Sequence, residues 1–492
     1  MKRTLIIATT LLLLVGCAQE NKPMTVIDET RQLLDQGQFS QAETKLKDVI
    51  NSGKYSGQKL DSLRFEYDRI QRIRNDYPLS KADLFEQLKE SIPDLTQQEF
   101  DQWIQEGKFD KRVIDGKTWF MYASRSNLFF RNPDIRARRT GVGDPTEDNL
   151  RYYTNMQKVK QTAASGINRY VDPQDYRLTM TVTTDDSVAK PGETIRAWLP
   201  IPRSYPFQTD FQVESASPSL QWIDRADAPM RSAYFEGAAD KNGAAEFKIT
   251  YTYRDYAVYQ DVKPDEVRTL TSEDLKSLEL EKYVQEEPPH IEFRPELKKL
   301  SEQIVGDETN PYLIAKKIYK WISANIQYSY AIEYSTILNI PTYCYGNKYG
   351  DCGQVALLFI TLLRYNNIPA RWQSSWFIMP GEKTIHDWAE MYIAPYGWLP
   401  VDPYMGQLTY QYMKTLSEEQ RNELNDFYFG NIDHFRMAAN GDYGKPLYPS
   451  KDSFRSDNVD FQRGELEVNG KNIYFNDFSY NLDIELLDTP VH

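Results

Sequence analysis

The stretch from Tyr349 to Arg364 constrains the fold of this chain more than any other segment. It reads Tyr-Gly-Asp-Cys-Gly-Gln-Val-Ala-Leu-Leu-Phe-Ile-Thr-Leu-Leu-Arg, so one cysteine, Cys352, stands directly before a long apolar run. Residues 355–363 include several strong helix formers, and the Asn-Asn-Ile-Pro that follows is a typical helix stop. The segment therefore predicts a buried helix with Cys352 at its N-terminus. The helix macrodipole and the unpaired N–H groups there favour a thiolate, which predicts a lowered pKa for Cys352.

A nucleophilic cysteine needs a base and a third group that orients the base. The chain contains four histidines, and one of them, His386, opens a segment at 385–393 that predicts a strand. The next four residues, Ala-Pro-Tyr-Gly, predict a turn, and residues 398–403 predict the hairpin partner, which carries Asp402. Because cross-strand neighbours in an antiparallel pair lie roughly 5 Å apart, His386 and Asp402 can meet on one face.

Several spaced motifs between residues 310 and 406 carry a resemblance to a known family. Gly-Asp-Cys, Ala-Leu-Leu-Phe, Leu-Leu-Arg, Ile-Pro-Ala-Arg, His-x-Trp-x-Glu and Gly-Trp-x-Pro-Val-Asp-Pro follow one another in this order. Together they resemble the transglutaminase-like superfamily. The resemblance implies a papain-like α+β core with Cys352 as nucleophile, His386 as general base and acid, and Asp402 as the group that orients the imidazole.

One residue departs from the family pattern. Asp387 follows the histidine where many members carry a small residue, and strand alternation predicts that its side chain points away from the site. The resemblance also implies an oxyanion site formed by the backbone N–H of Cys352 and an upstream side-chain donor, for which Tyr343 and Tyr345 are the candidates. The calcium sites of the animal crosslinking enzymes have no counterpart in the sequence, so no metal and no cofactor are expected.

The first residues of the chain predict export. Residues 1–16 combine a basic start with an apolar run too short to span a bilayer, as in a signal peptide. Leu-Val-Gly-Cys at 14–17 resembles a bacterial lipobox, which implies cleavage before Cys17, lipidation of Cys17 and stable attachment to a membrane. Ala18 after that cysteine favours the outer membrane of the bacterial cell envelope. A cleaved signal peptide with an incidental cysteine is the alternative.

The remaining cysteines and the charge narrow the possible partners. Cys344 and Cys352 are too few for a disulfide framework. A bond between them would silence the enzyme, but a buried, inert Cys344 is the simpler interpretation. His434 is likewise best interpreted as an ordinary hydrogen-bonded histidine. The net charge of −13 makes nucleic acid an unlikely partner. The expected partners are a peptide or protein substrate and, through Cys17, a membrane.

The pattern of elements predicts an α+β multidomain chain. Within a helical N-terminal region, residues 30–46 resemble a tetratricopeptide helix pair with Gly37 at the turn, but the absence of a second copy favours a plain helical bundle. Short alternating segments from about residue 176 predict a β-sandwich. The last region predicts a helix and a β-hairpin turning at Asn469-Gly470, whose strands pair with either the sandwich or the catalytic sheet. The expected ranges are 1–16 for the signal peptide, 17–125 for the helical region, 170–265 for the β-sandwich, 290–410 for the transglutaminase-like core, and 411–492 for the C-terminal β-rich extension.

Three functions are compatible with these features. An activated thiolate can attack an amide carbonyl and form a thioester, with the leaving nitrogen protonated by His386. Hydrolysis of the thioester makes the protein a peptidase or amidase, which is the favoured reading. Attack by an amine makes it a protein-crosslinking transglutaminase, and a binding module that keeps the fold without catalysis is the third alternative.

Overall fold

The structure is a computed structural model of the chain that describes residues 24–166 and 168–488. Its contacts divide the described residues into two compact units. The smaller unit contains the residues up to Asp68 together with Val113–Lys117, and the larger unit contains Arg69–Arg112 and the residues from Thr118 onward. The predicted signal peptide and Cys17 lie outside the described residues.

The smaller unit is built on a pair of helices joined at Gly37, as the sequence predicts. These helices are α1 (Val26–Asp35) and α2 (Phe39–Asn51), and the first part of α3 (Gln58–Asp76) follows them. Thr25 begins α1 with a capping box that satisfies free N–H groups of the first turn. Leu34, Phe39 and Leu46 are buried, so the pair packs through one apolar face.

The larger unit begins with further helices around a small aromatic core. Leu84, Phe100, Phe120 and Leu128 are fully buried in this core. The helices in this part are α4 (Lys81–Ser91), α5 (Gln97–Gln105), α6 (Ser124–Arg131), α7 (Pro133–Arg136) and α8 (Thr146–Ala164). The strands β1 (Lys111–Ile114) and β2 (Lys117–Phe120) contain residues of both units. The region is therefore mainly helical, with one short two-stranded sheet.

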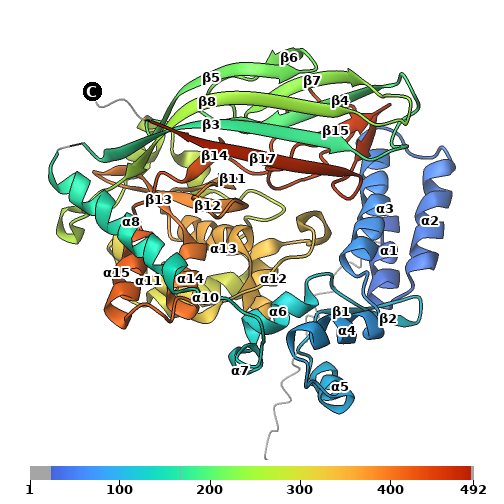
Figure 1. Cartoon of the computed structure of the whole chain (residues 1–492), viewed down its shortest axis with the longest axis horizontal. Helices are drawn as coiled ribbons and strands as arrows, with labels where there is room; N and C mark the ends of the chain where they lie inside the picture. The colour runs from blue at the N-terminus through green and yellow to red at the C-terminus, as the bar shows by residue number, and fades with distance from the viewer. Residues whose placement is uncertain (1–23, 167, 489–492) are drawn as a thin grey trace, which may run out of the picture. The chain divides into compact units, whose positions relative to one another are not determined.

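Two antiparallel sheets form the predicted β-sandwich (Figure 1). One has the strand order β17-β3-β8-β5 and the other the order β16-β15-β4-β7-β6. Apolar side chains from both sheets, such as Leu178 on β3 and Phe235 on β7, are fully buried in one shared core. The strands are β3 (Tyr170–Thr184), β4 (Thr194–Pro200), β5 (Gln208–Ser217), β6 (Leu220–Ile223), β7 (Ser232–Ala238), β8 (Glu246–Val258), β15 (Glu465–Val468), β16 (Lys471–Ile473) and β17 (Phe478–Leu487).

The C-terminal strands complete the sandwich, which answers the question that the sequence left open. Strand β15 pairs with β4, and β17 pairs along its whole length with β3. The predicted hairpin between β15 and β16 is confirmed, because Val468 pairs with Lys471 around Asn469 and Gly470. Both turn residues have a positive φ, as a type I′ turn requires.

The remaining part of the larger unit, the predicted core, contains a separate four-stranded antiparallel sheet covered by helices. Its strand order is β13-β12-β11-β14, and α13 packs against β11 and β12. Trp376 and Met437 from this sheet reach the sandwich core, so the sheet lies between the sandwich and the helices (Figure 1). The elements are α9 (Ser272–Ser277), α10 (Pro295–Val305), α11 (Pro311–Asn325), β9 (Gln327–Tyr328), α12 (Ile340–Asn347), β10 (Tyr349–Gly350), α13 (Cys352–Tyr365), β11 (Ala370–Phe377), β12 (Thr384–Ile393), β13 (Gly397–Val401), α14 (Pro403–Gln411), α15 (Glu418–Phe427) and β14 (Arg436–Asn440).

The helices of the core follow their sequence signals closely. Asn310 caps α11 by accepting from two backbone N–H groups, and proline occupies the first helical position. Ser417 begins α15 with a capping box, as expected for the polar helix there. No helix among the described residues has both the length and the apolar character required to cross a bilayer.

A close approach between α14 and α11 provides a test of this packing. A Cβ atom on Gly406 would lie 2.4 Å from Ser323 Oγ and 2.9 Å from Tyr319 Cζ, and both neighbours are buried. Because neither side chain has room to move, Gly406→Ala is expected to lower the free energy of unfolding by about 1–3 kcal/mol. Thermal and denaturant unfolding followed by circular dichroism measure the change.

Gly346 supplies the matched control for this substitution. It lies on α12 with no atom within 4 Å of its Cβ position. Gly346→Ala is therefore expected to be neutral or to stabilise the protein by up to about 1 kcal/mol through helix propensity. Equal effects of the two substitutions would contradict the packing argument.

Candidate active site

Cys352 is the first residue of α13, where the sequence places it. Asp351 caps the helix, and its Oδ1 accepts a hydrogen bond from the backbone N–H of Gln354 at 3.1 Å. The rest of the helix up to Arg364 is buried, and Asn367 follows it with a φ of 56°. The predicted helix, its start and its stop are all confirmed.

His386 and Asp402 form a buried hydrogen-bonded pair. The Nε2 atom of His386 lies 2.8 Å from Oδ2 of Asp402, and their side chains are 3% and 0% exposed. His386 is near the start of β12, while Asp402 lies one residue beyond β13 and caps α14. The predicted contact between His386 and Asp402 across the hairpin is therefore confirmed.

Arg436 joins the pair formed by His386 and Asp402, and the sequence did not indicate this contact. Its Nη1 atom lies 2.9 Å from Asp402 Oδ2, and the guanidinium is buried. Burial opposes ionisation of Asp402, yet the imidazole of His386 and the guanidinium of Arg436 hold its pKa below the ordinary value. Asp402 is thus a carboxylate, which fixes the orientation of the imidazole through Nε2.

The thiol of Cys352 makes its hydrogen bond to Asp387 rather than to His386. Its Sγ atom lies 3.4 Å from Asp387 Oδ2, and Asp387 is only 2% exposed. The side chain of Gln462 donates to the other carboxylate oxygen. The prediction that Asp387 points away from the site is therefore wrong. Alternation does place His386 and Asp387 on opposite faces of β12, but the N-terminus of α13 lies on the face of Asp387.

The predicted low pKa of Cys352 is also wrong. Burial, followed by the carboxylates of Asp387 and Asp351, raises the pKa of the thiol well above its ordinary value, although a backbone hydrogen bond from Asp387 acts in the opposite direction. The helix N-terminus still favours an anion, but it carries only about half an elementary charge, whereas each nearby carboxylate carries a full one. The thiol is therefore neutral at neutral pH in this arrangement.

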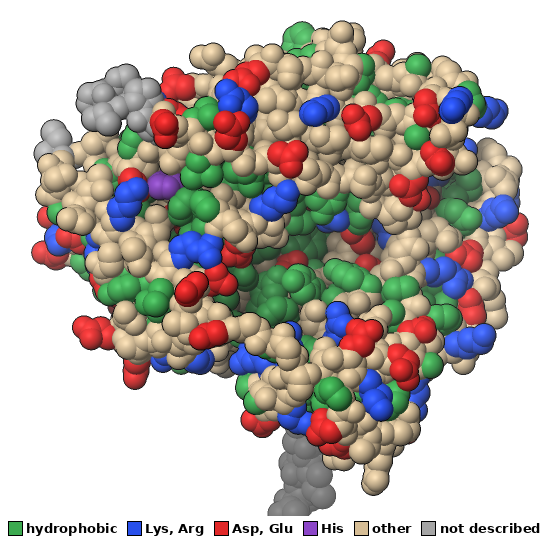
Figure 2. All heavy atoms as spheres, viewed as in Figure 1, with side chains coloured by type: hydrophobic (Ala, Val, Ile, Leu, Met, Phe, Trp, Pro, Cys, Tyr) green, Lys and Arg blue, Asp and Glu red, His purple; other side chains and the backbone are tan. Residues whose placement is uncertain are grey.

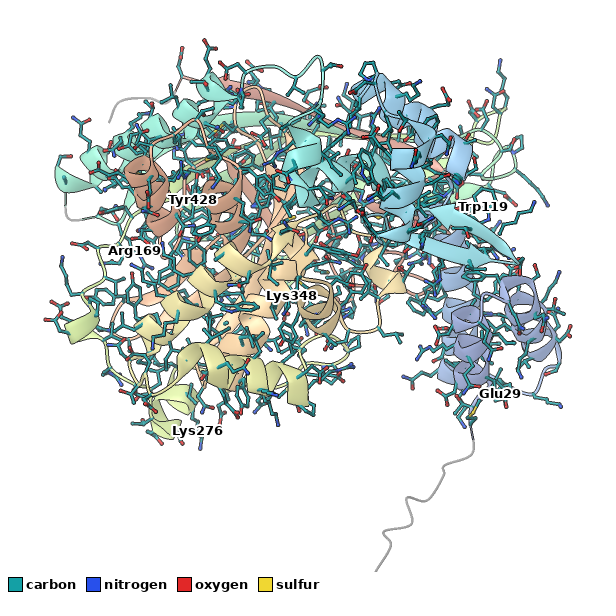
Figure 3. All side chains as sticks on the ribbon, turned by 90° about the horizontal axis from the view of Figure 1, so that it is seen from below. Glu29, Trp119, Arg169, Lys276, Lys348 and Tyr428 are labelled. Atoms are coloured by element: carbon teal, nitrogen blue, oxygen red, sulfur yellow. The ribbon has the colours of Figure 1, made fainter. Side chains whose placement is uncertain are left out.

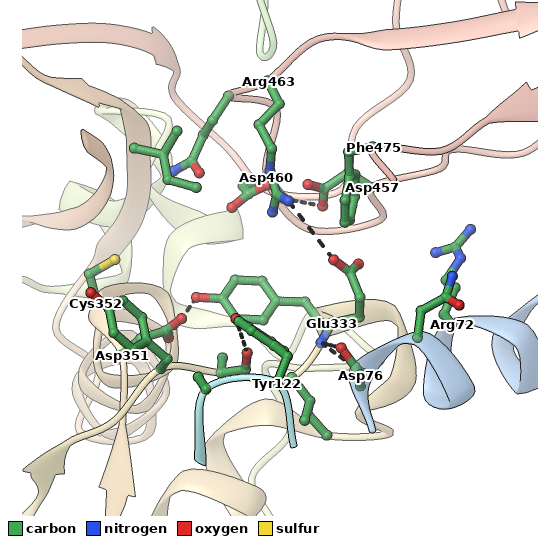
Figure 4. Close-up of a pocket in the computed structure, with 18 of the residues that line it drawn as sticks. Arg72, Asp76, Tyr122, Glu333, Asp351, Cys352, Asp457, Asp460, Arg463 and Phe475 are labelled. Atoms are coloured by element: carbon green, nitrogen blue, oxygen red, sulfur yellow. Dashed lines mark hydrogen bonds and ion pairs between the residues drawn. The ribbon is translucent and has the colours of Figure 1, made fainter. Parts of the chain in front are cut away.

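A cavity of about 610 Å³ opens beside the thiol (Figure 4). Its walls come from the end of α3, the segment before α12, the start of α13, β12 and the C-terminal residues around 457–463 and 474–480. In the space-filling view the surface is hollowed, and hydrophobic and acidic side chains are visible within the hollow (Figure 2). The cavity is lined by six carboxylates and two guanidiniums: Asp76, Glu333, Asp351, Asp387, Asp457, Asp460, Arg72 and Arg463.

Crowding and burial perturb these carboxyl groups. Burial raises the pKa of Asp351 to about 6, although hydrogen bonds from Tyr334 and Gln354 oppose the shift. Burial likewise raises the pKa of Glu333 to about 7 against the opposing charge of Arg463. Burial, assisted by neighbouring carboxylates, raises the pKa of Asp387 and Asp460 well above the ordinary value. In the part of the chain that the structure describes, no group of three or more His, Cys, Asp or Glu side chains is arranged to hold a metal ion.

Neither tyrosine expected at the oxyanion site reaches this cavity. Among the described residues that line it, Tyr343 and Tyr345 are absent. Both lie on α12, where Tyr343 packs against Tyr349 and the ring of Tyr345 lies 3.5 Å from Nζ of Lys348, which follows the helix (Figure 3). The geometry therefore does not support the assignment of either tyrosine to an oxyanion site.

Tyr334 is the tyrosine that the structure brings to the start of α13. Its hydroxyl group donates to Asp351 Oδ1 at 2.7 Å. A Cβ atom on Gly353 would lie only 2.2 Å from that hydroxyl and 2.6 Å from Asp387 Oδ2. The glycine after the cysteine is therefore required by the close approach of two polar side chains to the first turn of the helix.

The two other polar candidates have structural roles. Cys344 and Cys352 are both free, and burial raises the pKa of Cys344 far above its ordinary value, which fits an inert thiol. His434 lies with Nδ1 3.2 Å from Asp172 Oδ2 and is buried. Neither residue lines the cavity among the described residues.

Comparisons with known proteins locate the family resemblance. Residues 298–403, which include Cys352, His386 and Asp402, match the family model of the Transglutaminase-like superfamily. The resemblance predicted from the motifs is thereby confirmed. An uncharacterized protein of Haemophilus influenzae is 23% identical over 219 residues, which cover 39% of this chain and 58% of that relative's length.

Two solved structures are also similar to this chain. A protein named "Putative Cysteine Protease" from Cytophaga hutchinsonii has a TM-score of 0.43 at 16% identity, over 65% of this chain and 93% of that chain. The periplasmic domain of TgpA from Pseudomonas aeruginosa has a TM-score of 0.25 at 12% identity, over 53% of this chain and 99% of that chain.

The contact between Cys352 and Asp387 leads to a prediction for thiol reactivity. Asp387→Asn keeps the shape of the side chain and removes the charge that disfavours the thiolate, so the pKa of Cys352 is expected to fall. The pH midpoint of iodoacetamide alkylation, measured on the Cys352 peptide by mass spectrometry, is then expected to move to lower pH. Asp186→Asn, on an exposed residue, is the control. An unchanged midpoint, or one that moves upward, would contradict the argument.

The raised carboxyl pKa values predict how stability depends on pH. The folded state holds protons on Glu333 more strongly than the unfolded state does, so this contribution to stability is present below pH about 4.5 and is lost as the pH rises through about 7. Glu333→Gln removes the group that must ionise. The melting temperature of the variant relative to that of the wild type is therefore expected to rise between pH 5 and 8. Glu86→Gln on the exposed face of α4 is the control, and parallel pH curves for Glu333→Gln and wild type would refute the prediction.

Proposed function

We propose that the protein is a cysteine-dependent acyl-transfer enzyme, because residues 298–403 match the family model of the transglutaminase-like superfamily. It acts on the amide bonds of a peptide or protein substrate through a thioester on Cys352, and water resolves the thioester. The protein is thus a peptidase or amidase. The observation that carries the proposal is the buried 2.8 Å hydrogen bond between His386 and Asp402, within the family range that also contains Cys352.

The first half-reaction uses the cysteine and the histidine. The sulfur of Cys352 attacks the amide carbonyl carbon while its proton passes to His386, whose Nε2 is held by Asp402, so Nδ1 is the receiving atom. The imidazolium then protonates the leaving nitrogen as the C–N bond breaks, and a thioester remains. In this proposal the oxyanion is stabilised by backbone N–H groups at the start of α13.

The resting thiol must leave Asp387 before it reacts. Its hydrogen bond to that carboxylate keeps the proton on sulfur, and the proposed reaction requires the thiol to move from the Asp387 face of β12 to the imidazole. Asp402 and Arg436 support this step because the paired carboxylate stabilises the imidazolium that forms. Asp387 thus acts as a brake on the nucleophile.

In the second half-reaction, water attacks the thioester carbonyl carbon. His386 accepts the proton from water, the C–S bond breaks, and Cys352 recovers its proton. Attack by an amine at the same carbon would give a new amide and make the protein a crosslinking transglutaminase. A protein that retains the fold without either reaction would be a binding module.

A peptide library distinguishes these outcomes. The purified protein is incubated with the library in the presence and absence of a primary amine, and the products are read by mass. Cleavage or deamidation that needs no amine is the expected result. Loss of ammonia with gain of the amine mass would indicate transfer instead, and an unaltered library would indicate a binding module.

Substitutions in the site test the assigned roles. Cys352→Ala is expected to abolish turnover because no other group supplies the nucleophile. Asp402→Asn is expected to reduce kcat by a large factor, of order 10⁴ in an analogous serine triad, because the imidazole loses the carboxylate that orients it. Exposed Asp186→Asn is the control, and wild-type rates for either site variant would move the chemistry elsewhere.

The cellular location proposed for this enzyme is the bacterial cell envelope, with attachment to the outer membrane through lipid on Cys17. The proposal is supported by the lipobox-like residues 14–17 alone. Cys17→Ser is expected to move the protein from the membrane fraction to the soluble fraction of the producing cells and to abolish labelling with a fatty acid. Labelling that persists in the variant would refute this anchor.

A further inference from the structure

The cavity beside Cys352 is lined by more acidic groups than basic groups. Six carboxylates line it against two guanidiniums. Asp387 contacts Sγ of Cys352 and also interacts electrostatically with Asp460. Figure 4 shows Asp460 close to Asp457 and Arg463. A cation placed among these acids would favour their ionised forms and be attracted to them, whereas an anionic group would not.

Asp460 points to an occupant for this cavity. Its side chain is 4% exposed, and its Oδ1 atom has no hydrogen-bond partner among the described residues. Burial, followed by the interaction with the carboxyl group of Asp457, raises the pKa of Asp460. A buried carboxylate oxygen without a donor is unfavourable, since buried polar groups are otherwise nearly always hydrogen-bonded. The missing partner is thus a hydrogen-bond donor, and the surrounding charge favours a positively charged one.

The two guanidiniums of the wall already have other contacts. Nη1 of Arg72 donates to the backbone oxygen of Ser456 at 2.7 Å, and the guanidinium lies 4.1 Å from the ring centroid of Tyr474. Arg463 lies 4.0 Å from Glu333 and 3.9 Å from the ring centroid of Phe475. Aromatic rings of the wall thus make cation–π contacts with these two guanidiniums. The other aromatic rings of the wall can make the same contact with a substrate cation.

Further aromatic rings lie where the cavity meets solvent. Tyr122, Tyr330 and Tyr480 all line it and are 50%, 44% and 37% exposed. Their ring faces offer cation–π contacts to a positive group that enters. The wall therefore combines hydrogen-bond acceptors, negative charge and aromatic faces, which together are the requirements for binding an alkylammonium group.

We propose that the acidic cavity binds a primary ammonium group of the same peptide whose amide Cys352 attacks. This inference rests on the proposed function and specifies its substrate class. The ammonium sits between Asp457 and Asp460, and the amide bond to be broken reaches Cys352, beside Asp387, at the other end of the same wall. A cavity of about 610 Å³ is within the ordinary range for such a recognition site, roughly 300–1,000 Å³. The ammonium group comes either from a free N-terminal amine or from a lysine-like side chain.

Binding of this group also has a consequence for the nucleophile. Burial, followed by the carboxyl groups of Asp387 and Asp351, raises the pKa of Cys352 and holds the proton on sulfur. A positive charge placed among them offsets that effect and makes the thiolate easier to form. The enzyme would then be activated by the substrate that it recognises, and it would spare amides that lack a cation nearby.

Three tripeptide amides test the proposal in a binding experiment on the Cys352→Ala protein. Acetyl-Ala-Lys-Ala carries only a side-chain ammonium, unacetylated Ala-norleucine-Ala carries only an α-ammonium, and acetyl-Ala-norleucine-Ala carries neither. Isothermal calorimetry is expected to give at least tenfold tighter binding for one of the first two than for the third. The preferred peptide identifies the source of the ammonium.

Second substitutions in the same Cys352→Ala protein locate the site. Asp460→Asn, and separately Asp457→Asn, are expected to reduce the binding ratio to threefold or less, whereas exposed Asp186→Asn is expected to leave it unchanged. Equal binding of the three peptides, or a ratio that survives both cavity substitutions, would overturn the proposal. Competition by millimolar calcium that is equally strong against all three peptides would also overturn it, in favour of a metal ion.

The peptide library separates failure of this inference from failure of the proposed function. Selective binding of an ammonium peptide without cleavage of any library member would refute the proposed enzymatic function but support the ammonium site. Cleavage by wild-type protein with no enrichment of cationic residues near the broken bond would refute the site but keep the enzyme.

Discussion

The contact between the first turn of α13 and strand β12 is the constraint on which the rest of the site depends. It places Cys352 against Asp387 at 3.4 Å, and it is possible only because residue 353 is a glycine with two polar side chains pressed against it. The strand then determines the other half of the site by alternation. Asp387 faces the cysteine, and His386 faces the opposite side, where Asp402 and Arg436 hold it.

This arrangement sets two electrostatic influences against each other. The helix N-terminus favours a thiolate, while burial and two carboxylates favour the neutral thiol, and the second influence is the stronger. On the other side of the strand the balance is reversed, because Asp402 is buried beside a guanidinium and an imidazole and remains ionised. Strand β12 thus separates the Cys352 thiol, which is held neutral beside Asp387, from His386, which pairs with the ionised Asp402. The proposed reaction requires the thiol to move from the first environment to the second.

The large unit brings together residues that are far apart in the chain. Arg436, on the strand that extends the catalytic sheet, supports the pair formed by His386 and Asp402. Gln462, just before β15, donates to Asp387, and Asp460 and Arg463 complete the acidic wall. The C-terminal strands therefore close the β-sandwich and also position the loop that shapes the cavity. Folding of the sandwich therefore also determines the positions of these cavity residues.

The sequence alone determined the elements that local signals specify. The apolar run after Cys352, the strand that begins near His386, the capped helices at Asn310 and Ser417 and the turn at Asn469-Gly470 all form as predicted, because periodicity, caps and turn residues act within a few positions. The pairing of His386 with Asp402 was accessible for the same reason, since a short hairpin joins them. The orientation of Asp387, the raised pKa of the thiol, the position of Tyr343 and Tyr345 away from the cavity, and the roles of Arg436 and Asp460 were decided only by tertiary structure. Each depends on which distant segment packs against a residue and on how much water that packing removes, and a single sequence carries no local signal for either.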